Sequence, residues 1–152
     1  MRIGGPSILV WGAILEDGSR ALIRCEGSLD AKKYQDVLQE GLQNFDLATS
    51  VFMQDGARCH TAASTINYLE KKHVMLLSDW PPQSPDINII ENLWYILKKN
   101  VSCRHITDAN NLWTVAKDEW DQISDNIIKK LYKSIPTRLK AIRTSKGFPI
   151  KY

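Results

Sequence analysis

The stretch WPPQSPDINIIENLW, residues 80–94, lies where an apolar strand is expected to end and a helix to begin. Its three prolines lack a backbone N–H donor, so a β-ladder cannot continue and the chain must turn over residues 79–85. We expect a short strand over 74–77 before this turn. After it, Asp86 is placed to cap a helix over 87–100 whose apolar side chains follow one stripe. This succession is typical of an α/β fold.

The chain before residue 74 alternates apolar runs with helical patterns. The pair Asp17-Gly18 is a strong hairpin signal between two apolar runs. Ser28 to Asp30 offers a cap for an amphipathic helix whose apolar side chains recur at intervals of three and four residues. The expected elements are a hairpin of strands over 7–15 and 20–25, a helix over about 31–45, a strand over 50–53 and a helix over 62–72.

Beyond residue 100 the apolar spacing is helical. One helix is expected to follow Thr107-Asp108, and one or two more to occupy 123–146, broken near Pro136 because proline removes a helical hydrogen bond. The resulting order, β-β-α-β-α-β-α followed by helices, predicts an α/β fold with a mixed sheet flanked by helices.

Composition excludes several classes of protein. A chain of 152 residues with 43% hydrophobic residues suits one domain with an ordinary core, not a disordered or fibrous protein. It has no apolar run of about 18 residues and no recognisable signal peptide, so we expect an intracellular protein without a membrane partner. The odd set Cys25, Cys59 and Cys103 predicts free thiols.

Charge is distributed unevenly. Residues 1–125 hold 12 Lys and Arg against 17 Asp and Glu, a net charge of −5, whereas residues 126–152 hold 8 basic residues and no acidic one. A basic segment after an acidic body indicates a polyanionic partner, because cations that neutralise phosphates release condensed counterions. The alternative is a solvated, lysine-rich helix face.

Two carboxylates are placed where chemistry is possible. Asp55 directly follows a predicted strand, at the carboxyl end where α/β proteins bind ligands, and Glu91 lies in the first turns of a helix beside its apolar stripe. Such a pair would suit Mg²⁺ or Mn²⁺ and phosphoryl transfer. The alternatives are a turn in which Asp55 bonds its own backbone, and a salt bridge from Glu91 to Lys98, Arg58 or another cation.

Three blocks in this order carry a resemblance to a known family. They are GGPSILVWGAI at 4–14, QDGARCHTA at 54–62 and WPPQSPDINIIENLW at 80–94, and 35 residues separate Asp55 from Glu91. The chain resembles the C-terminal part of the catalytic domain of mariner-superfamily transposases, in the Tc-one-like branch. The resemblance spans nearly the whole chain from Gly4.

The resemblance implies an RNase H-like fold and an Asp-Asp-Glu site that uses Mg²⁺ or Mn²⁺. Asp55 is then the second catalytic carboxylate and metal ligand, and Glu91 the third. The implied reaction is DNA cleavage at transposon ends and strand transfer into target DNA, in transposition and DNA integration. The implied partner is DNA, in the nucleus.

Three departures from the family pattern lead to further expectations. The family's first catalytic Asp and its helix-turn-helix region lie upstream of the GGPSILVWGAI block, with which this chain begins, and Asn88-Ile89 replaces the usual Asn-Pro. We expect a sheet without its first, central strand, a free edge that favours a homo-oligomer, and little activity. We expect a partial catalytic domain over 1–105 and a helical extension with a basic tail over 106–152.

Candidate DNA contacts combine resemblance with charge. His60 stands in the QDGARCHTA block, where it could contact a phosphate or orient the metal site, or pack locally at a helix start. The basic residues are Lys98, Lys99, Arg104, Lys129, Lys130, Lys133, Arg138, Lys140 and Arg143.

Two other interpretations stay open. One is a catalytically inactive DNA-binding or protein-interaction module derived from a transposase. The other is a longer product whose start codon has been misassigned, which would restore the first Asp and the enzyme.

Overall fold

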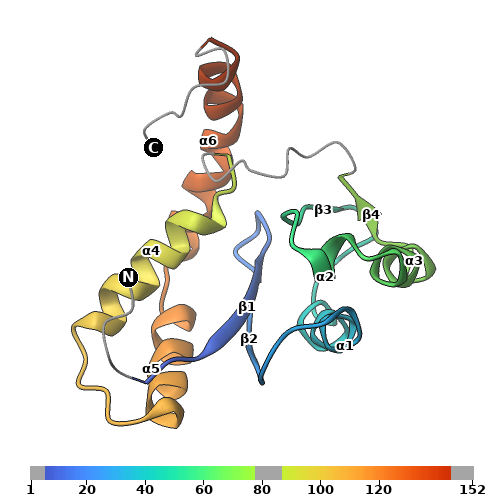
Figure 1. The fold of residues 1–152 in the computed structure, drawn as a ribbon. Helices are drawn as coiled ribbons and strands as arrows, with labels where there is room; N and C mark the ends of the chain where they lie inside the picture. The colour runs from blue at the N-terminus through green and yellow to red at the C-terminus, as the bar shows by residue number, and fades with distance from the viewer. Residues whose placement is uncertain (1–5, 78–86, 145–152) are drawn as a thin grey trace. The chain divides into compact units, whose positions relative to one another are not determined.

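The computed structural model describes residues 6–77 and 87–144 (Figure 1). The chain divides into two compact units, one formed by residues 1–24 with 85–152 and the other by residues 25–84. The elements are β1 (Leu9–Ile14), β2 (Arg20–Cys25), α1 (Ala31–Gly41), β3 (Val51–Phe52), α2 (Arg58–Thr61), α3 (Ala63–Lys71), β4 (Met75–Leu76), α4 (Ile90–Ser102), α5 (Ala109–Asp121) and α6 (Asp125–Thr144).

The predicted hairpin is confirmed. β1 and β2 are hydrogen-bonded neighbours, and their turn is closed by Leu15 N donating to Ser19 O at 2.8 Å and Gly18 N donating to Leu15 O at 3.0 Å. Gly18 has a φ of 103°, a conformation that side chains disfavour. The Asp17 carboxylate accepts from Ser19 N at 2.7 Å. The Asp-Gly pair therefore sets the turn as its chemistry predicts.

The core of this first unit lies between the hairpin and the three C-terminal helices. Its central residues are Leu22, Leu93, Leu97, Ala116, Trp120, Ile123 and Ile128. Asp108 begins α5, accepting from the backbone of Asn110 at 2.8 Å and Asn111 at 2.9 Å. Helices after residue 105 thus share a unit with β1, β2 and α4. The domain boundary expected at 105 stays a prediction.

The helix expected over 87–100 begins later and ends later, at Ile90 and Ser102. Asn88 explains the late start, because its side-chain oxygen accepts from Ile90 N at 3.3 Å and forms a turn that competes with helix. Ile87 and Ile89 on either side of Asn88 are buried. The predicted turn over 79–85 and the cap at Asp86 lie outside the described residues.

The break expected near Pro136 is absent, since α6 is continuous from Asp125 to Thr144. Pro136 donates no helical hydrogen bond, but the turn around it is supported by side chains. Ser134 Oγ donates to Leu131 O at 2.6 Å and accepts from Arg138 Nε at 2.9 Å. The packing of the buried face of α6 thus outweighs the local preference.

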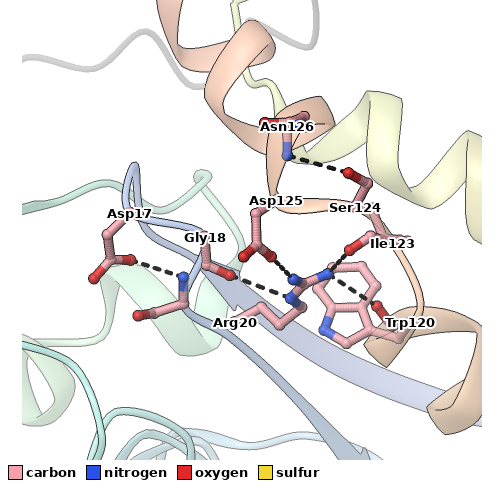
Figure 2. A network of polar contacts seen from close by, with 9 residues as sticks. Asp17, Gly18, Arg20, Trp120, Ile123, Ser124, Asp125 and Asn126 are labelled. Atoms are coloured by element: carbon pink, nitrogen blue, oxygen red, sulfur yellow. Dashed lines mark hydrogen bonds and ion pairs between the residues drawn. The ribbon is translucent and has the colours of Figure 1, made fainter.

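Arg20 joins the hairpin to the junction of α5 and α6 (Figure 2). Its guanidinium donates to the carbonyl oxygen of Ile123 and pairs with the Asp125 carboxylate. It also donates to Gly18 O at 3.2 Å and reaches Trp120 O at 3.5 Å. Because the Arg20 side chain is only 15% exposed, these contacts are partly shielded from water.

We expect Arg20→Ala to lower the free energy of unfolding by about 2 kcal/mol, because it leaves helix-end carbonyls without a charged donor. Urea denaturation measures the change. Arg24→Ala is the matched control, since the Arg24 guanidinium makes an exposed hydrogen bond to Asn110 at 2.9 Å, and we expect a loss of about 0.5 kcal/mol or less. Equal losses in both variants would contradict this role of Arg20.

The second unit combines a short parallel sheet with three helices. β3 pairs with β4 in the register Val51 to Met75 and Phe52 to Leu76. Asp30 caps α1 by accepting from Lys33 N at 2.9 Å. α1 ends at Gly41, earlier than expected. The helix expected over 62–72 appears as α3, preceded by the short α2.

The four described strands form two separate two-stranded sheets. The expected α/β composition is confirmed, but no described strand joins the hairpin to the β3–β4 pair. Self-association through a free sheet edge stays a prediction. The three cysteines are free, as expected. Among the helices of residues 6–77 and 87–144, none combines the length and apolarity needed to cross a bilayer.

Candidate functional site

Asp55 lies in the segment that follows β3. Its side chain is 60% exposed, and its Oδ1 accepts from Ala57 N at 3.0 Å, so the predicted turn to its own backbone is formed. Oδ1 also lies 2.6 Å from Nδ1 of His60, although the ring N–H direction does not point along this contact. Within the described residues, Oδ2 makes no hydrogen bond, so one carboxylate oxygen of this exposed side chain has no polar partner there.

A polar and aromatic network holds the Asp55 segment to α1. Tyr34, which is fully buried on α1, donates its hydroxyl to Gln54 Oε1 at 2.8 Å. Gln54 Nε2 donates to the backbone oxygen of His60 at 3.1 Å, and the Tyr34 and His60 rings lie 4.2 Å apart between centroids. His60 therefore packs locally and also contacts the carboxylate. Sequence reasoning missed the supporting roles of Tyr34 and Gln54, although Gln54 directly precedes Asp55.

Glu91 lies in the first turn of α4, and its side chain is exposed. It forms no ion pair or side-chain hydrogen bond with any described residue, so the salt bridge considered to Lys98 or Arg58 is not formed within that part of the chain. Asp55 and Glu91 belong to different compact units. Each carboxylate is held at an element end with at least one oxygen available.

The chemistry of each carboxylate, taken by itself, suits a hard divalent cation. Mg²⁺ and Mn²⁺ prefer oxygen ligands and keep several waters, so an exposed carboxylate is a suitable donor. Burial raises the pKa of the nearby Cys59 thiol, which disfavours the thiolate that a softer metal would require. Within residues 6–77 and 87–144, no cluster of three or more His, Cys, Asp or Glu side chains is assembled.

All but one of the predicted basic residues are exposed; the exception, Arg138, is buried. The exposed residues on helices are Lys98 and Lys99 on α4, and Lys129, Lys130, Lys133, Lys140 and Arg143 on α6. Arg104 is also exposed, but its Nε donates to Glu119 at 2.8 Å and pairs a buried carboxylate.

The family of DDE superfamily endonucleases matches residues 3–113, which include both Asp55 and Glu91. This chain belongs to the DDE superfamily endonucleases. Its resemblance to Tc-one and mariner transposases is confirmed by proteins of known sequence and structure.

Two curated relatives of this DDE endonuclease domain are nematode transposases. The transposable element Tcb1 transposase of Caenorhabditis briggsae is 33% identical over 153 residues, covering 98% of this chain and 56% of the relative. The Tc3 transposase of Caenorhabditis elegans is 36% identical over 155 residues, covering 98% of this chain and 47% of the relative. The chain therefore spans about half the length of these relatives.

Solved structures show the fold of the domain. The catalytic domain of the Mos1 mariner transposase matches with a TM-score of 0.75 at 20% identity, covering 95% of this chain and 75% of that chain. The Mos1 catalytic domain solved with raltegravir and Mn has a TM-score of 0.78 at 18% identity, covering 95% and 76%. The chain thus has an RNase H-like α/β fold, as the resemblance implied.

Two of the sequence blocks of this DDE endonuclease domain meet in its core. A Cβ at Gly12 in β1 would lie 2.6 Å from the ring of Trp94 in α4, so only glycine permits this approach. The Trp94 ring also stacks on Trp120, with centroids 5.0 Å apart. The VWG and ENLW blocks therefore fix α4, and Glu91 with it, against the hairpin.

Arg138, proposed above as a DNA contact, is only 3% exposed and holds the domain together instead. Its Nε donates to Ser134 Oγ and another guanidinium nitrogen donates to Asn92 Oδ1, both at 2.9 Å. Charge counting could not separate this buried arginine from its exposed neighbours. Because Asn92 follows Glu91, the guanidinium fastens α6 to the first turn of α4.

We expect Arg138→Ala to lower the free energy of unfolding by about 2–3 kcal/mol, since it removes a buried side chain and leaves the half-buried Ser134 and Asn92 without their charged donor. Lys140→Ala, two residues further along α6 and exposed, should change it by about 0.5 kcal/mol or less. Urea denaturation of both variants provides the comparison. A loss as small for Arg138→Ala as for Lys140→Ala would place the Arg138 guanidinium on the surface.

Proposed function

We propose that this chain supplies part of a divalent-metal site that acts on DNA phosphodiester bonds, in the cleavage and strand transfer of DNA transposition. The observation that carries the proposal is the pair Asp55 and Glu91. Both are exposed, both keep carboxylate oxygens free within the described chain, and both stand in the sequence blocks of the family.

In this proposal Asp55 and Glu91 hold Mg²⁺ or Mn²⁺ through their free oxygens. A cation held there would supply a lowered pKa for an attacking water and positive charge beside the phosphate oxygens. Ala57 N donates to Oδ1 of Asp55, so the proposal assigns the metal to Oδ2. The Mos1 catalytic domain has been solved with Mn and with Mg, which supports the choice of ion.

The proposed DNA contact is a basic stripe on α6, defined as Lys129, Lys133, Lys140 and Arg143. These positions lie on one face of a helix with 3.6 residues per turn, extend about 21 Å along its axis and are exposed. No acidic residue follows Asp125 in the sequence. Such a stripe suits phosphates and carries no means of reading bases. Mos1 was solved in a pre-cleavage transpososome and in a strand transfer complex, which supports DNA as partner. The nuclear site of action is part of the proposal and rests on the family resemblance alone.

A second candidate function is a DNA-binding module without catalysis. It is favoured by the position of the basic stripe on α6, which carries neither Asp55 nor Glu91, because α6 could then bind DNA whether or not a metal is held. The two candidates differ in whether DNA binding and metal binding are independent.

Titration calorimetry with Mn²⁺ tests the metal site. We expect saturable binding to the wild-type chain, and loss of that binding in both Asp55→Ala and Glu91→Ala, because two ligands are needed to hold one ion. Asp36→Ala is the matched control, since Asp36 is an exposed carboxylate on α1, and it should bind Mn²⁺ like the wild type. Identical traces for all four proteins would remove the metal site and favour the module without catalysis.

The salt dependence of duplex DNA binding tests the basic stripe. Removal of one phosphate contact reduces the slope of log affinity against log salt by about 0.9. We expect this reduction for Lys133→Ala, measured by fluorescence anisotropy between 50 and 200 mM salt, a range over which the Debye length falls about twofold. Lys71→Ala on α3 removes one exposed charge outside the stripe and should leave the slope unchanged. Equal slopes for both variants would contradict a role for the stripe.

A further inference from the structure

The exposed face of α4 carries an aromatic ring. Tyr95 is 70% exposed, the largest exposed fraction among the large apolar side chains reported for the described residues. The opposite face of the same helix is in the core, where Leu93 is fully buried and Leu97 is 5% exposed. Tyr95 therefore lies on the solvent face of α4, and the core-facing side of the helix is formed by other residues.

Tyr95 stands between a carboxylate and two ammonium groups. Glu91 precedes it by four residues, and Lys98 and Lys99 follow it by three and four, so all four side chains share one face of the helix. One turn, about 6 Å along the axis, separates the ring from Glu91 and from the lysines. All four side chains are exposed. The face thus offers a proposed metal ligand, an aromatic surface and cations in sequence.

We propose that Tyr95 is a stacking platform for an unpaired base of a DNA strand whose phosphates contact Lys98 and Lys99. Sites that bind single strands combine a positively charged track with aromatic rings on which bases stack. In a duplex the bases already stack on one another, so the ligand is a nucleotide that is unpaired or displaced from the helix. The inference rests on the proposed function in one respect, that the polymer is DNA.

The contact lies within one helical turn of Glu91. An unpaired nucleotide on Tyr95 would therefore have its strand beside the proposed metal ligand. This placement assigns Tyr95 to holding the strand and leaves the reaction itself to the carboxylates. It separates the site from the basic stripe on α6, which suits duplex phosphates.

Binding of a labelled oligothymidine strand and of a duplex of equal length to the full 152-residue chain tests the proposal. We expect Tyr95→Ala to weaken single-strand binding about tenfold, measured by fluorescence anisotropy, because one stacked base is lost. Tyr95→Phe keeps the ring and should bind within about twofold of the wild type. Duplex binding should be unchanged in both variants. Since Tyr95 is exposed, neither variant should unfold, which circular dichroism verifies.

Three outcomes would overturn the proposal: equal single-strand affinity of Tyr95→Ala and wild type, equal weakening of single-strand and duplex binding, or no single-strand binding by the wild type. A change of mass in sedimentation for Tyr95→Ala, with DNA affinities unchanged, would assign the ring to a protein contact instead. Failure of the proposed function would give a different result from failure of this inference. If the proposed function is wrong, the wild-type chain does not bind Mn²⁺ or its duplex binding does not depend on salt, while the comparison of Tyr95→Ala with wild type on the single strand can still be made.

Discussion

The packing of α4 against the hairpin is the constraint on which the first unit depends. Trp94 reaches β1 only because residue 12 has no Cβ, and the same ring stacks on Trp120 of α5. One side chain thereby joins a strand and two helices. Dispersion contacts of this density are lost outright when a ring is displaced. This contact helps to fix the direction of α4, and with it the direction of the side chains on its exposed face.

One face of α4 contributes to stability, and the opposite face carries the residues proposed to act on the ligand. Leu93 and Leu97 point inward and are buried, while Glu91 and Tyr95 point outward with no share in the core. Arg138 adds a polar fastening at the first turn through Asn92. A rigid helix that is fixed at its start by hydrogen bonds and along its length by apolar packing can present exposed groups without using them for folding. In the second unit, Tyr34 and Gln54 do the same for the Asp55 segment.

Local chemistry predicted much of the fold and of the candidate site. The Asp-Gly turn and the elements around Asp30 lie where their signals place them, because these signals act over two to four residues. The start of α4 was missed because Asn88 forms a turn of its own, and the continuity of α6 was missed because it depends on packing that no local pattern reveals. Arg138 was assigned to the surface for the same reason. Burial depends on tertiary packing, so the number of charges in a segment does not predict which of its side chains are buried.

The order of the two units along the chain bears on how the protein folds. The second unit is continuous, from residue 25 to 84, whereas the first is completed only when residues 85–152 join the hairpin. During synthesis the second unit can therefore form early, whereas the apolar hairpin is covered only after α4, α5 and α6 have been synthesised. Contacts of high sequence separation slow folding, and a waiting apolar strand pair is exposed to aggregation. The first unit is thus the part of the protein whose folding depends most on contacts between residues far apart in the sequence.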